Sequence, residues 1–129
     1  MHGDFNSLYN SVRTTGDRCM GVEYGWEVFY TQMRAAVRSQ ETLQTRLEYV
    51  VSNVFPLSRD HFPSDATWED FQTFKKEATK RPARFEGEGT IHATTSQMTD
   101  EEAKRHLETC FDLFSTIAKA AGAQTNGFS

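Results

Sequence analysis

Apolar side chains recur at helical spacing in three long segments, and this pattern predicts the main helices of the protein. The segments cover residues 22–38, 43–54 and 99–121, and in each the apolar positions alternate between steps of four and three. A 3.5-residue repeat keeps neighbouring helices in contact when they cross at about 20°. The repeated positions are Val22, Trp26, Phe29, Met33 and Ala36, then Leu43, Leu47, Val50 and Val54, and finally Ala103, Leu107, Cys110, Phe114, Ile117 and Ala121.

The helix over 99–121 has the clearest end signals. Thr99 is a good N-cap, and Glu102 stands where the reciprocal hydrogen bonds of a capping box need an acid. Gly122 follows the last apolar position, as a helix terminator does. We therefore expect the helix to end before Gly122 and residues 123–129 to form a disordered tail.

Two weaker patterns predict further helices. Thr67 with Asp70 resembles a capping box, and apolar residues follow at helical spacing until Ala78, shortly before Pro82. A short helix over Asp4–Val12 is predicted by apolar residues at similar spacing. Residues 56–65 contain two prolines and are predicted to form a structured loop.

Residues 83–97 hold two glycines and little apolar content, which is typical of a loop. Thr90 to Thr95 are rich in β-branched residues, so a short strand is the alternative there. No second strand is recognisable, and a lone strand leaves its backbone groups unpaired. A loop lying on the helices is therefore favoured for this segment.

These patterns predict an all-α protein, an antiparallel bundle of four to five helices with residues 1–122 as a single domain. The chain has 129 residues, of which 37% are hydrophobic and 12% aromatic, so it can build a core. No unbroken apolar run exceeds three residues, which excludes a membrane span. The first residues lack the pattern of a signal peptide, and we expect a cytoplasmic protein.

Motifs that would support catalysis or a cofactor are missing from the sequence. His106 and Cys110 stand one helical turn apart, but a closed zinc site needs four ligands, and a buried thiol explains Cys110 better. A disulfide between Cys19 and Cys110 is not expected, because a cytoplasmic chain is kept reduced. The acidic residues, Glu86 and Glu88 among them, are interpreted as capping or solvated groups. We expect no enzymatic activity, no metal and no cofactor.

Positive charge gathers between residues 75 and 84, although the chain as a whole has a net charge of −4. One interpretation is a helix C-terminus, where the helix dipole favours cations. The other is a basic patch that docks an acidic protein or a nucleic acid. The cations are Lys75, Lys76, Lys80, Arg81 and Arg84, with Glu77 as the one acid among them.

Two of the predicted helices carry more apolar residues than one buried face requires. Phe111, Leu113 and Ala118 flank the apolar stripe of the last helix, and Tyr30 and Val37 widen the stripe of residues 22–38. A central position in the bundle is one explanation of this surplus. The alternative is a face for a partner or a second copy, because monomers seldom expose large apolar patches.

The function hypothesis is a small non-catalytic protein that binds another protein or itself. A regulator, an accessory subunit of a larger assembly, and an inhibitor or immunity factor all belong to this class. The candidate partner-binding residues are Phe111, Leu113, Ala118 and Tyr30. The alternative is a nucleic-acid-binding accessory subunit that uses residues 75–84.

Overall fold

The computed structural model describes residues 17–125, with side chains from 21 to 122, and every regular element in this part of the chain is a helix. The predicted all-α class is therefore confirmed, whereas the predicted helix over Asp4–Val12 lies outside the described residues. The elements are α2 (Asp17–Arg38), α3 (Leu43–Val54), the short 3-10 helix η1 (Arg59–His61), α4 (Asp65–Ala78), α5 (Thr90–Thr95) and α6 (Asp100–Thr125).

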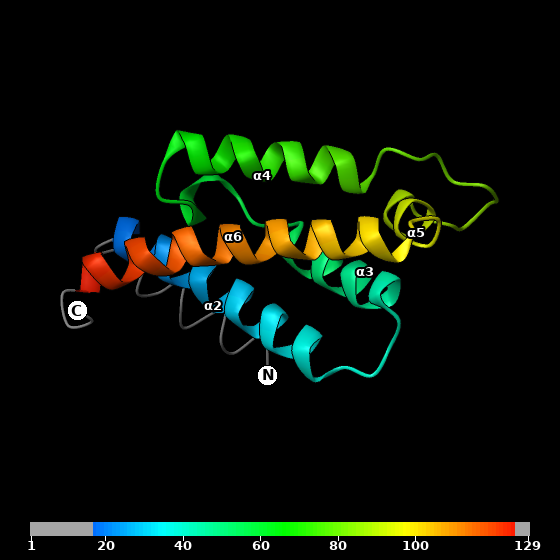
Figure 1. The fold of residues 1–129 in the computed structure, drawn as a ribbon. Coiled ribbons are helices and arrows are strands. Elements are labelled where there is room, and N and C mark those ends of the chain that lie inside the picture. The colour runs from blue at the N-terminus through cyan, green and yellow to red at the C-terminus, as the bar shows by residue number, and fades with distance from the viewer. Residues whose placement is uncertain (1–16, 126–129) are drawn as a thin grey trace.

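Helix α6 occupies the middle of the bundle. It packs against α2, α3 and α4, and in the view of Figure 1 it runs between α4 above and α2 below. The four long helices alternate in direction along the chain, as short connections between neighbouring helices require. The short helix α5 packs against α3 and α4 at the end of the bundle where α6 begins.

Three phenylalanine rings from different elements form the centre of the core. Phe29 of α2 meets Phe62, which follows η1, with ring centroids 6.3 Å apart, and Phe71 of α4 at 6.2 Å. Phe62 and Phe71 are 4.6 Å apart, and all three side chains are at most 2% exposed. Edge-to-face and tilted contacts of this kind add to the free energy gained from burial. The segment 56–65, predicted to be a structured loop, contains η1 and is held to the core through Phe62.

Helix α2 approaches η1 so closely that two of its positions have no room for a side chain. A Cβ built on Gly25 would lie 2.3 Å from the carbonyl oxygen of His61, and one on Gly21 would lie 2.6 Å from that of Asp60. Gly21, Gly25 and Phe29 are spaced four residues apart and share one helix face. The glycines therefore let α2 lie directly on the η1 backbone while Phe29 enters the core.

Most helix ends agree with the sequence, including both ends of α3 and the last residue of α2, whereas α2 begins earlier than expected and two further ends differ. At α6 the capping box is present, since Glu102 N–H donates to Thr99 Oγ1 (3.1 Å) and Thr99 N–H donates to the Glu102 carboxylate (2.9 Å). Helix α6 continues through Gly122 to Thr125, so the expected end before Gly122 is wrong. Ser64 is the N-cap of α4, and its hydroxyl accepts from Thr67 N–H, so Thr67 is the third helical residue and not the cap.

Residues 90–95 form helix α5, so both the loop and the strand expected there are wrong. Ala93, Thr94 and Thr95 are buried, and the two threonine hydroxyls donate to the carbonyls of Thr90 and Ile91 (2.7 and 3.0 Å). This bonding satisfies polar groups that would otherwise be buried without partners. Packing against α3 therefore overrides the strand preference of β-branched residues.

Because α2 lies so close to η1, we predict that a glycine-to-alanine change on this face of α2 destabilises the protein, although the same change usually stabilises a helix. Gly→Ala inside a helix ordinarily stabilises by about 1 kcal/mol. Gly25→Ala should instead lower the free energy of unfolding by about 1–3 kcal/mol, because the new methyl group would overlap the His61 carbonyl. Urea denaturation followed by circular dichroism measures this change.

Gly89→Ala is the matched control, since a Cβ at Gly89 meets nothing within 4 Å. We expect its effect to stay below about 1 kcal/mol. A Gly25→Ala variant as stable as the wild-type protein would contradict the packing of α2 on η1.

Candidate functional site

An apolar groove lies between the second half of α2 and the middle of α6. Its volume is about 950 Å³. Turns of α2 and α6 supply most of its lining, and Arg46 of α3 contributes at one side. We call it the α2–α6 groove and define it by its apolar lining side chains Tyr30, Met33, Val37, Leu107, Phe111 and Phe114.

A continuous strip of aromatic rings crosses this groove from one helix to the other. Trp26 stacks on Tyr30 with ring centroids 5.3 Å apart, Tyr30 lies 6.3 Å from Phe114, and Phe114 lies 6.0 Å from Phe111. Phe111 is 55% exposed, Tyr30 is 41% exposed, and Val37 is 82% exposed. Large apolar side chains from two helices are therefore left in water side by side.

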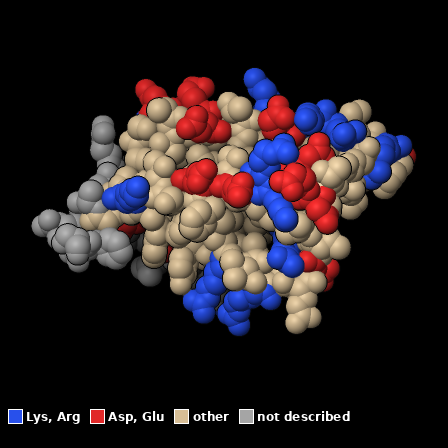
Figure 2. Space-filling model, viewed as in Figure 1, with Lys and Arg blue, Asp and Glu red and all other residues tan. Residues whose placement is uncertain are grey.

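The two edges of the groove carry opposite charges. Arg34, Arg38 and Arg46 stand on the side of α2 and α3, whereas Glu108 and Asp112 stand on α6. In Figure 2 the blue side chains at the lower edge lie over the end of α2, and red side chains follow α6, with an uncharged surface between them. The groove thus combines an apolar floor with one basic edge and one acidic edge.

The structure divides the four predicted partner-binding residues into two groups. Tyr30 and Phe111 line the groove, as expected of a partner face. Leu113 is only 4% exposed and belongs to the core, so its place on an exposed face is wrong. It lies about 200° around the helix from Phe111 and faces a smaller cleft toward α4. Ala118 is partly buried and does not line the groove.

The predicted basic patch is largely engaged in contacts within the chain. The Lys75 ammonium lies 4.4 Å from the Phe55 ring centroid and donates to the Phe55 carbonyl (3.3 Å), and burial lowers the Lys75 pKa. Lys80 pairs with Glu77 at 3.1 Å. Arg81 donates to the Gln97 side chain, and Arg84 pairs with Glu88. Lys76 is exposed and has no ion pair among the described residues.

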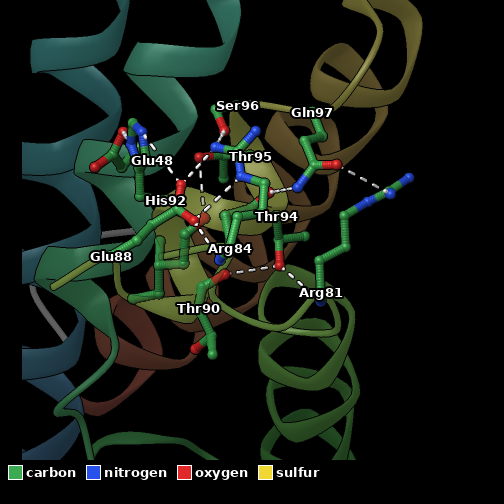
Figure 3. Close-up of polar contacts among 12 residues, drawn as sticks. Glu48, Arg81, Arg84, Glu88, Thr90, His92, Thr94, Thr95, Ser96 and Gln97 are labelled. Atoms are coloured by element: carbon green, nitrogen blue, oxygen red, sulfur yellow. Dashed lines mark hydrogen bonds and ion pairs between the residues drawn. The ribbon is translucent and has the colours of Figure 1, made fainter. Parts of the chain in front are cut away.

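Arg84 and Glu88 belong to a polar network that fixes residues 79–89 onto α5, shown in Figure 3. The Glu88 side chain is only 1% exposed, so its assignment as a solvated group is wrong. It accepts from the Arg84 guanidinium and from Arg84 N–H (2.8 Å). These hydrogen bonds, from the side chain first and the backbone second, lower the Glu88 pKa from 4.5 to about 2.

His92 and Ser96 extend this network to α3 and along α5. The His92 ring lies between two carboxylates, with Nδ1 2.9 Å from Glu48 Oε1 and Nε2 3.8 Å from Glu88 Oε2. Arg84 also donates to the Ser96 hydroxyl (3.0 Å). The sequence does contain a signal for this network, since polar residues recur at every fourth position in Arg84, Glu88, His92 and Ser96. The glycines around Glu88 obscured it, because they favoured a solvated loop.

The side-chain pair considered for a metal does not form a metal site. Cys110 is fully buried, and burial raises the pKa of its thiol. His106 Nδ1 donates to the backbone carbonyl of Glu102 at 2.8 Å. Within residues 17–125 no group of three or more histidine, cysteine or acidic side chains is arranged to hold a metal ion.

Comparison with protein-family models, with curated protein sequences and with solved structures gave no significant match. Among the helices of the described residues, none combines the length and the apolar character that a bilayer crossing demands. The candidate site is therefore defined by the structure itself, and the α2–α6 groove is its most developed surface feature.

The depressed pKa of Glu88 predicts a specific dependence of stability on pH. A carboxyl whose pKa is lower in the folded state stabilises the protein above its unfolded value, near 4.5, and loses that effect as the pH falls toward about 2. Glu88→Gln should therefore melt at a lower temperature than the wild-type protein at neutral pH. The difference should shrink between pH 4.5 and 2, as measured by thermal melts at several pH values.

The control for this experiment is Glu86→Gln, which changes an exposed carboxyl in the same segment. Its melting temperature should follow that of the wild-type protein throughout the pH range. If the difference in melting temperature between Glu88→Gln and the wild-type protein stays constant down to pH 2, the ionised Arg84–Glu88 pair does not stabilise the fold.

Proposed function

We propose that this chain is a non-catalytic protein-binding protein, a regulator, accessory subunit or inhibitor, that docks its partner in the α2–α6 groove. The observation that supports the proposal is the aromatic strip, which includes the exposed rings of Tyr30 and Phe111. Burying such rings against a partner removes apolar area from water. Contiguous apolar patches on a protein surface typically mark interaction sites.

The residue types in the groove suit a protein partner. Tyrosine, tryptophan and arginine are the residues that dominate binding free energy at protein interfaces. Here Tyr30, Arg34 and Arg38 line the groove, and Trp26 stacks on Tyr30. Val37 at the rim is exposed, and a partner surface broad enough to cover both helices would remove its side chain from water.

The nucleic-acid alternative has less support than the groove, because most cations of residues 75–84 already make contacts within the chain. A cation that already pairs with Glu77 or Glu88 must give up that contact, or share it, before it binds a phosphate. A cytoplasmic location is also part of the proposal, and the buried free thiol of Cys110 is compatible with the reducing environment there.

Phe111→Asp tests the proposal, because it places a charge in the lining of the groove without removing a core side chain. The wild-type protein, immobilised and exposed to a native lysate treated with nuclease, should retain a protein partner. Phe111→Asp should bind this partner about 30-fold more weakly, as expected for loss of a central aromatic contact. Mass spectrometry and titration with the recovered partner measure the effect.

Phe85→Asp is the matched control, since Phe85 is 61% exposed and lies outside the groove. Both variants should keep the melting temperature of the wild-type protein within a few degrees. Recovery of the same partners by Phe111→Asp as by Phe85→Asp would refute the proposal. Loss of all binding on nuclease treatment would favour the nucleic-acid alternative.

A further inference from the structure

Four charged residues at the edges of the α2–α6 groove have no counter-charge among the described residues. Arg34 and Arg38 are exposed on α2, and Glu108 and Asp112 are exposed on α6. None of these four side chains forms an ion pair within the described residues. Arg34 donates a hydrogen bond to the Tyr30 hydroxyl (3.1 Å), which holds its guanidinium beside the aromatic strip. A partner that fits must therefore bring acids to one edge and cations to the other.

The same surface of a second copy meets this requirement. Because α2 and α6 lie side by side, a two-fold axis parallel to the groove places α2 of one copy over α6 of the other. Rotation about this axis keeps every residue at its own height along the groove. Since all four charged residues line the same stretch, the basic edge of each copy then faces the acidic edge of the other.

The apolar floor fits the same arrangement. Phe111 on α6 and Tyr30 on α2 lie on opposite sides of the groove, so the rotation brings the Phe111 ring of one copy toward Tyr30 of the other. A two-fold axis across the groove would instead place arginine over arginine and acid over acid. Like charges in contact disfavour that alternative.

We propose that the occupant of the α2–α6 groove is a second copy of this chain. Arg34 and Arg38 of one copy face Glu108 and Asp112 of the other across a two-fold axis parallel to the helices. This proposal rests on the proposed function and identifies the partner. The two-fold axis doubles every charge contact, so four residues of the sequence supply both edges of the interface.

Charge reversal of one edge at a time tests the proposal in the full-length chain. Arg34→Glu/Arg38→Glu makes both edges acidic, and Glu108→Lys/Asp112→Lys makes both edges basic. Each variant alone should self-associate at least about tenfold more weakly than the wild-type protein, because like charges then face each other. An equimolar mixture should regain association, since each acidic edge meets a basic edge. Sedimentation equilibrium measures the constants.

Lys76→Glu/Lys104→Glu is the control, because it changes the net charge as much as the arginine reversal at exposed sites outside the groove. It should self-associate like the wild-type protein, and circular dichroism should show that every variant stays folded. Rescue by mixing also excludes misfolding as the cause of weakened association.

Three outcomes would overturn the proposal. These are a wild-type chain that stays monomeric up to about 100 μM, one-edge variants that associate like the wild-type protein, and a mixture that stays monomeric. If the chain is monomeric but Phe111→Asp loses a different protein, the second copy is refuted while the proposed function stands. If the chain is monomeric and Phe111→Asp retains every captured protein, both are refuted.

Discussion

The contact of α2 with the η1 backbone determines where the rest of the bundle can lie. Gly21 and Gly25 leave no side chain between helix and loop, so the next residue on that face, Phe29, reaches Phe62 at the end of η1. With this face of α2 fixed, the adjoining flank that carries Tyr30 is turned toward α6. The aromatic strip of the groove is therefore a consequence of a packing contact on the neighbouring face of the same helix.

The wide apolar stripe of α6 has two causes, and its two flanks separate them. Leu113 faces α4 and is buried, so the central position of α6 explains that flank. Phe111 lies on the other flank, where Phe114 contacts it only in part and the residue stays 55% exposed to water. A surplus of apolar residues on a helix thus predicts either burial or an interface, and only the neighbouring helices decide between them.

The sequence predicts the parts of this fold that depend on local signals. The capping box of Thr99 and Glu102 and the periodicity of the long helices were recognisable because each requires residues close together in the chain. Helix α5 was not, because its threonines favour strands until tertiary contacts bury them. Gly25 was missed for a related reason, since an apolar pattern does not count a residue whose role is to leave space.

The charge pattern along the chain and the charges available at the surface point to different sites. In the densest run of cations, three side chains already contact Glu77, Glu88 or the Phe55 ring. Breaking these contacts would reduce the net free energy of binding to a new partner. Arg38 and Asp112 belong to no dense run, yet they have no ion pair within the described part of the chain. Charges without a counter-charge in residues 17–125, beside exposed apolar rings, can contribute their full attraction to a partner. That combination favours the groove over the basic segment as the site of function.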